Sequence, residues 1–109
     1  MLQEISNPDL RLEDLPPSTA DWETIGTFAL TFNGYHRWPD SPSCGDIAND
    51  VAEHYSETGR LPQGLDVLRS CLFFEQRRWR HFGDTPEGED LAYIKALVAA
   101  IRWHVERRH

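Results

Sequence analysis

The apolar residues of the chain recur at intervals of three and four positions, the spacing that places side chains on one face of a helix. The longest series of this kind consists of Leu91, Ile94, Val98, Ile101 and Val105. Shorter series precede it, and together they predict helices at about 18–33, 44–58, 64–82 and 86–107. Because no segment alternates apolar and polar residues, we predict no β-sheet.

Residues that favour helix ends separate the four segments. Ser18 is expected to cap the first helix, with Asp21 three residues further on. Gly59 and Gly83 should end the second and third helices, because glycine tolerates left-handed backbone. Pro86 suits the first turn of the fourth helix. Connections this short favour an antiparallel bundle, although they leave other four-helix arrangements open.

The first 17 residues differ from the rest of the chain. Residues 1–17 lack a helical period, end in two prolines and carry mostly acidic charges, so we interpret them as an irregular acidic N-terminal arm. The helical domain then covers 18–109. The expected fold class is all-α, a four-helix bundle-like single domain. Its third helix is expected to be central, because Cys71–Phe74 is apolar all round.

Composition and charge narrow the class of protein. The formal net charge of −7 argues against non-specific binding to nucleic acid or to an anionic membrane. The longest uncharged apolar run, Ala96–Ile101, is far too short to span a membrane. The charged N-terminal residues predict no signal peptide, and 2 cysteines do not make a disulfide scaffold. We therefore expect a cytoplasmic protein. Lys95 is the single lysine among 11 lysine and arginine residues, and a GC-rich bacterial genome would produce this preference for arginine.

A basic cluster lies near the end of the third predicted helix and consists of Arg77, Trp79, Arg80 and His81. These cations could bind phosphate groups while Trp79 stacks on a base. The position offers a structural explanation as well, because a helix dipole favours cations at its C-terminus. A protein interface is the third interpretation of the cluster.

Acidic residues line one face of the second predicted helix: Asp46, Asp50, Glu53 and Glu57. His54 lies one turn after Asp50, and a carboxylate and an imidazole at this spacing can ligate a metal ion. A solvated face, or a face paired with the arginines of the third helix, explains the pattern equally. No second cluster of ligands has the spacing of a metal site, so we expect no metal ion and no other cofactor.

Glu75 falls on or near the apolar face of the third predicted helix. A carboxylate in that position must be paired or protonated, and Arg102 and His54 are the candidate partners. A buried ion pair that fixes the helix register is the simplest interpretation. A catalytic role would require Glu75 and His54 to share a cavity.

Two further features point to a contact with another protein. Tyr35, His36 and Trp38 fall in a loop, where large aromatic residues mark a contact or cover the end of a core. The fourth predicted helix carries a second stripe beside its core face: Ala92, Ala96, Ala99 and Trp103. Such small residues let another helix come close, either within this chain or in a homodimer.

Recognised catalytic motifs are absent from the sequence, including a glycine-rich phosphate loop, Cys-x-x-Cys and His-Glu-x-x-His. We therefore predict a small helical protein-binding protein without catalytic activity. The sequence does not identify the protein partner. One possibility is a second copy of the chain, in a homodimer formed through the fourth helix. A nucleic-acid or phosphate-ligand binder is the first alternative. The second is a helical-bundle enzyme or metal protein that uses Asp50, Glu53, His54 and Glu75.

Overall fold

The computed structural model describes residues 11–32, 44–61 and 64–107. These residues form the helices α1 (Trp22–Ala29), α2 (Cys44–Thr58), α3 (Leu65–Phe82) and α4 (Gly88–Arg107). Two short 3₁₀ helices flank α1 in the sequence, η1 (Leu12–Asp14) and η2 (Leu30–Phe32). The described ranges contain no strand, and the expected all-α fold class is confirmed.

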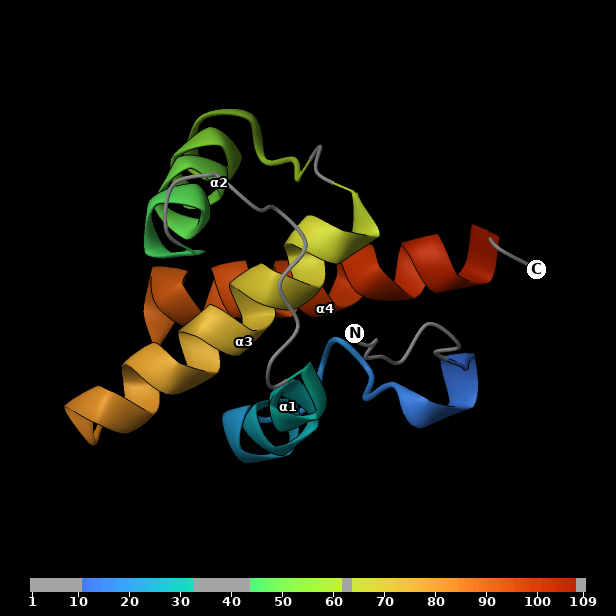
Figure 1. The fold of residues 1–109 in the computed structure, drawn as a ribbon, viewed down its shortest axis with the longest axis horizontal. Coiled ribbons are helices and arrows are strands. Elements are labelled where there is room, and N and C mark those ends of the chain that lie inside the picture. Colours follow the sequence, from blue (N-terminus) through green and yellow to red (C-terminus); the bar gives the residue numbers. More distant parts are fainter. Residues whose placement is uncertain (1–10, 33–43, 62–63, 108–109) are drawn as a thin grey trace, which may run out of the picture.

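α3 is the central helix of the fold, because it packs against α1, α2 and α4. Figure 1 shows α1 and α2 on opposite sides of α3. Both are seen nearly end-on, while α3 and α4 run across the picture. The other three helices are therefore gathered round α3, and α1 and α2 lie across it and not parallel or antiparallel to it. This crossing positions the cleft described below.

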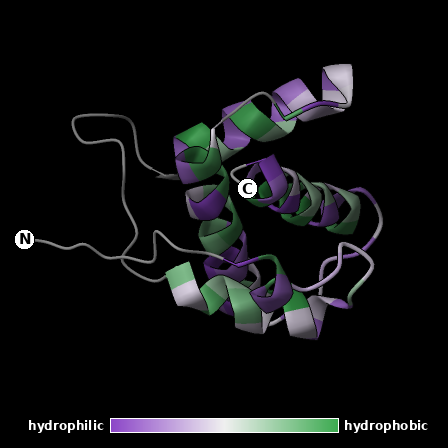
Figure 2. Cartoon of the chain, turned by 90° about the vertical axis from the view of Figure 1, so that its right-hand side faces the viewer, coloured by the Kyte–Doolittle hydropathy of each residue, from purple (hydrophilic) through white to green (hydrophobic). Residues whose placement is uncertain are grey.

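The core lies where α1, α2 and α4 meet α3. Each helix is amphipathic and carries both apolar and polar bands (Figure 2). The side chains that α3 and α4 bury completely include Leu68, Leu72, Ile94, Leu97, Val98, Ile101 and Val105. Four of these belong to the series that the sequence pattern identified in α4. Cys71 is also buried, as its apolar neighbours predicted.

Two helices begin later than the sequence predicted. Asp21, not Ser18, is the N-cap of α1, because its carboxylate accepts a hydrogen bond from the backbone N–H of Thr24 at 2.9 Å. α4 begins at Gly88 and not at Pro86. Gly88 has a φ of 59°, a left-handed conformation that cannot continue a helix backwards towards Pro86. Pro86 is instead completely buried before the helix begins.

The described part of the N-terminal arm is tied to the helical domain. Leu15 belongs to the hydrophobic core, and Leu12 packs against it. The guanidinium of Arg102 on α4 donates hydrogen bonds to the backbone carbonyls of Leu15 and Pro16, at 3.3 and 3.2 Å. Arg102 therefore holds the arm and does not pair with Glu75. The prediction that Arg102 is a partner of that carboxylate is wrong.

Candidate functional site

A cleft separates α2 from α4, and it contains two cavities that meet at Tyr55 and Gly59. We call the larger one the apolar cavity; it has a volume of about 950 Å³. The smaller one, the polar cavity, has a volume of about 400 Å³ and reaches down to α3. Both volumes fall in the range of pockets that hold a small ligand or a partner's side chains.

The apolar cavity lies beside the C-terminal half of α4. Its α4 wall is made by Ala96, Ala99, Ala100 and Trp103. Tyr55 and Leu61 form the opposite wall at the end of α2, and Arg60 and His104 supply the charged or titratable side chains. A mostly apolar lining with a polar edge is the usual composition of a protein-docking surface.

The second stripe of α4 faces outward and is not enclosed by the helices of this chain that the structure describes, which was the first of the two interpretations that the sequence offered. Ala92 and Ala99 are exposed, Ala96 is half-buried, and the Trp103 side chain is 50% exposed. The guanidinium of Arg107 lies over the Trp103 ring, 4.7 Å from its centroid. Within the described residues, the other helices therefore leave the stripe largely uncovered, and the Trp103 ring contacts Arg107 and His104 of α4 itself.

The polar cavity is assembled from three helices. α3 contributes Glu75 and Arg78, α4 contributes Asp90 and Tyr93, and α2 contributes Tyr55. Glu89 at the start of α4 adds another carboxylate. The Tyr55 and Tyr93 rings lie against one another with their centroids 6.0 Å apart.

Glu75 is the buried carboxyl group of this cavity, only 3% exposed. It accepts a hydrogen bond from the indole N–H of Trp79 at 3.1 Å, and Nη1 of Arg78 lies 3.6 Å from its other oxygen. Burial raises its pKa, and the negative charge of Asp90 raises it further, whereas Arg78 and Trp79 lower it. The partners of Glu75 are thus residues one turn away on α3, and neither Arg102 nor His54, the two that the sequence suggested.

Tyr93 has no counterpart among the residues that the sequence analysis singled out. This residue is only 7% exposed, and its hydroxyl is buried beside the thiol of Cys71. Burial raises the pKa of this phenol, and the neighbouring Cys71 and Glu75 raise it further.

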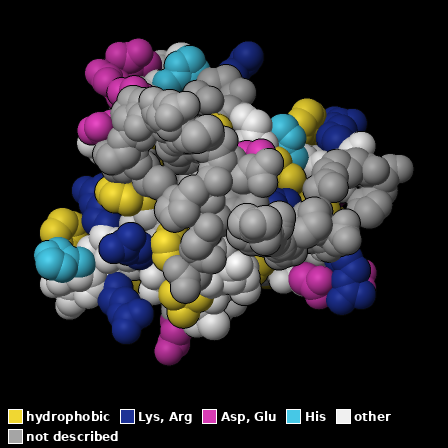
Figure 3. Space-filling view, in the orientation of Figure 1, with side chains coloured by type: hydrophobic (Ala, Val, Ile, Leu, Met, Phe, Trp, Pro, Cys, Tyr) yellow, Lys and Arg dark blue, Asp and Glu magenta, His cyan; other side chains and the backbone are white. Residues whose placement is uncertain are grey.

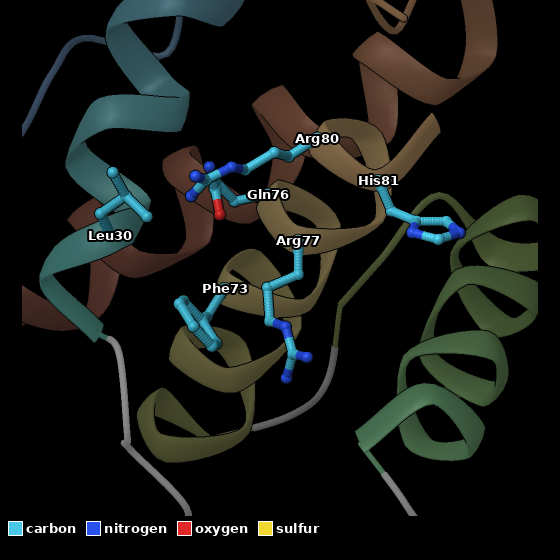
Figure 4. A pocket seen from close by; sticks show the side chains of 6 residues that line it. All are labelled: Leu30, Phe73, Gln76, Arg77, Arg80 and His81. Carbon is cyan, nitrogen blue, oxygen red and sulfur yellow. The ribbon is translucent and has the colours of Figure 1, made fainter. Parts of the chain in front are cut away.

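The basic end of α3 borders a separate cavity of about 460 Å³, lined by Leu30, Phe73, Gln76, Arg77, Arg80 and His81. Basic side chains gather on this part of the surface (Figure 3). In Figure 4, however, Arg80 extends towards Gln76, while Arg77 and His81 point in other directions. These three cations do not converge on one point, as a site for a single phosphate group would require.

Trp79 lies apart from these cations, on the side of α3 that faces the polar cavity. Its indole is hydrogen-bonded to Glu75, and its ring contacts Phe82 with centroids 5.7 Å apart. The structure therefore divides the basic cluster: Arg77, Arg80 and His81 share one face, and Trp79 belongs to another.

The remaining sequence candidates do not join either cavity. Asp50 and Glu53 are exposed on α2, and His54 is half-buried but does not line the cavity that contains Glu75. In the described part of the chain, no three His, Cys, Asp or Glu side chains are grouped closely enough to hold a metal ion. The aromatic residues Tyr35, His36 and Trp38 lie outside the described residues.

Comparisons with known proteins add no family. The chain matches no protein-family model, no curated protein and no solved structure. Among the described helices, none is long and apolar enough to cross a membrane. The functional argument therefore rests on the residues and cavities of this chain.

Proposed function

We propose that this chain is a non-catalytic interaction protein that binds a second copy of itself through the outward face of α4. The observation that carries the proposal is the exposed Trp103 at one end of a stripe whose other members are alanines. A large apolar side chain that is half exposed loses contact with water only when a partner covers it.

The stripe is self-complementary in shape when two copies of α4 run antiparallel. Ala92 and Trp103 lie at equal distances along the helix from the midpoint between Leu97 and Val98, and so do Ala96 and Ala99. A two-fold axis at that midpoint would set Trp103 opposite Ala92 of the second copy. The bulky ring would then meet the smallest side chain of the stripe, and the central alanines would let the two helices approach closely.

The charges at the two ends of α4 favour the same arrangement. The first turn carries Glu89 and Asp90, and the last turn carries His104 and Arg107. In an antiparallel pair, the basic end of each helix faces the acidic end of the other. A parallel pair would instead bring like charges together, which disfavours it.

The alternative functions have weaker support. A phosphate or nucleic-acid site would need Arg77, Arg80 and His81 to converge, but they point in different directions. The net charge of −7 also disfavours binding to a polyanion. An enzyme that pairs Glu75 with His54 would need both residues in one cavity, and only Glu75 lines the polar cavity.

Light scattering on purified chains at micromolar concentration tests the proposal. We expect the parent to have the molar mass of a dimer and Trp103→Glu to be a folded monomer, because the new charge would be buried at the interface. Phe82→Glu is the matched control. Phe82 is another exposed aromatic residue, 58% exposed, but it lies at the end of α3, so this variant should remain a dimer. A monomeric parent would overturn the proposal and would leave the stripe to a different protein.

A further inference from the structure

The cavity at the basic end of α3 takes no part in the proposed dimer, which uses α4. Its lining residues on α3 recur at intervals of three and four positions between Phe73 and His81, so they form one stripe about two turns long. Leu30 lines it from η2, which packs against α3. We call this cavity of about 460 Å³, together with its lining residues, the basic groove.

The cations of the basic groove are not neutralised within the described part of the chain. Arg77 and Arg80 are exposed and form no ion pair with a described residue, whereas the neighbouring Arg78 lies 3.6 Å from Glu75. None of the described residues that line the groove is acidic. The helix dipole accounts for cations in the last turn, where Arg80 and His81 lie, but Arg77 precedes that turn.

Gln76 gives an independent indication of a ligand. It lines the groove and is only 9% exposed, yet its side-chain amide forms no hydrogen bond with another described residue. Buried amide groups ordinarily have a hydrogen-bond partner. Arg80 extends towards Gln76 (Figure 4). A carboxylate placed between the two would accept hydrogen bonds from the amide and from the guanidinium.

The groove also contains apolar surface, which distinguishes a peptide from a simple anion. Leu30 is 43% exposed, and Phe73 is half-buried. An apolar side chain of a partner would remove this surface from water. A phosphate group has no such side chain. The separation of Arg77 from Arg80 likewise suits two carboxylates on different residues of a peptide.

An acidic peptide also fits the groove better than a nucleic acid does. Trp79, the candidate for base stacking, lies on another face of α3. The net charge of −7 repels a long polyanion strongly, because many of its phosphates would lie near the carboxylates of this chain. A short segment interacts mainly with the groove itself, since salt screens charges that are more than about 8 Å away.

We propose that the basic groove binds a segment of another protein in which an apolar side chain lies next to carboxylates. One carboxylate accepts hydrogen bonds from Arg80 and Gln76, and a second pairs with Arg77. The apolar side chain packs against Leu30 and Phe73. This inference goes beyond the proposed dimer and does not depend on it.

The side-chain amide of Gln76 provides a direct readout, because its N–H groups would bind the carboxylate. We would titrate the ¹⁵N-labelled full chain with the peptide acetyl-Leu-Glu-Glu-Leu-Glu-Glu-amide, and Gln76→Met identifies the signal. A saturable shift with a Kd below about 1 mM is the expected result. Two control peptides, one with glutamine for every glutamate and one with serine for every leucine, should each bind at least about fivefold more weakly.

Three variants locate the site. The double variant Arg77→Gln, Arg80→Gln should weaken binding of the first peptide about tenfold, since two ion pairs are lost. Leu30→Ser should weaken it about threefold, because apolar contact is lost. Arg60→Gln removes the same kind of charge outside the groove and should bind within about twofold of the parent. All four positions are exposed, so the denaturant midpoints should stay close to that of the parent.

The absence of a saturable shift would overturn the proposal. Equal binding of the glutamine peptide would do the same, as would unchanged binding in the double variant or tighter binding of the oligonucleotide hexauridylate, which would assign the groove to nucleic acid. By light scattering, the double variant should have the molar mass of the parent, and a different mass would assign the groove to a second copy of the chain.

The outcome is distinguishable from that of the proposed self-association. The titration is carried out on the parent and on Trp103→Glu, and both should bind the first peptide equally. A dimeric parent that binds no peptide would contradict this inference alone. A monomeric parent that binds it would contradict only the proposed dimer.

Discussion

α4 meets its two neighbouring helices in opposite ways. Towards α3 it presents Ile94, Val98 and Ile101, all completely buried. Towards α2 it leaves a cleft with cavities of about 950 and about 400 Å³. Close packing gives the first contact its dispersion and hydrophobic stabilisation, whereas the cavities lack those contacts. One face of α4 thus holds the fold together, and the other keeps an exposed aromatic side chain, Trp103, that a partner can cover.

The largest expected effect comes from removing a large side chain from the packed core between α3 and α4. Leu72 on α3 is completely buried in the core, and Leu72→Ala should reduce the free energy of unfolding by about 2–5 kcal/mol. Denaturant titration of the parent and the variant measures the loss. A loss below about 1 kcal/mol would mean that the core is not closely packed at this position.

The next effect concerns the buried carboxyl group at the edge of the cleft. The pKa of Glu75 is raised in the native state, mainly by burial, so the folded chain holds this proton more tightly than the unfolded chain. The stability that this proton confers is fully present below the ordinary pKa of a glutamate. It is lost as the pH rises through the raised value.

Glu75→Gln removes this pH dependence. The unfolding free energy of the parent, relative to that of Glu75→Gln, should therefore fall as the pH rises above about 4.3, by at most about 1.4 kcal/mol per pH unit. Denaturant midpoints for the two proteins across a pH series measure the difference. A difference that stays constant or grows with pH would show that burial does not govern this carboxyl group.

A smaller effect is expected where α4 holds the N-terminal arm. Arg102→Met keeps the apolar stem but removes the hydrogen bonds to the carbonyls of Leu15 and Pro16. We expect a loss of about 1 kcal/mol of unfolding free energy. Arg77→Met, on the exposed side of α3, is the matched control and should change stability by less than about 0.5 kcal/mol. Equal losses in the two variants would show that the hydrogen bonds do not stabilise the arm.

The smallest effect on folding is expected at the open side of α4. Trp103 is half exposed, so Trp103→Ala should change the unfolding free energy by less than about 0.5 kcal/mol at concentrations low enough to keep the chain monomeric. The same substitution should weaken self-association. Thermal or denaturant unfolding at low concentration measures the first quantity. A loss comparable to that of Leu72→Ala would place Trp103 in the core and remove the contrast between the two faces.

The packed side of the molecule could be predicted from the sequence, because burial acts on a whole helical face and leaves a regular spacing. Ile94, Val98, Ile101 and Val105 were identified on that basis and are buried, whereas Leu91 of the same series is half-buried. Helix ends were less predictable, because they depend on single capping contacts. Asp21 replaces Ser18 as the cap of α1 through one hydrogen bond to Thr24, which the sequence pattern does not distinguish.

The cleft could be predicted only in part. The outward stripe of α4 follows from helical spacing, and Trp103 was identified from it. Tyr93 was missed because its place in the cleft depends on the angle at which α2 and α4 cross α3, and short connections do not fix that angle. The partners of Glu75 could have been predicted from the sequence, because Arg78 and Trp79 lie three and four residues further along the same helix.

The register of the proposed dimer tests the central claim, that the outward face of α4 is self-complementary. In that register Ala92 of one copy lies opposite Trp103 of the other, so Ala92→Trp alone sets two large rings against each other and should yield a monomer. The double variant Ala92→Trp, Trp103→Ala exchanges the two residues and restores the match. Light scattering should therefore show a dimer for the double variant and the parent and a monomer for Ala92→Trp. A monomeric double variant, or an undisturbed dimer of Ala92→Trp, would contradict the account.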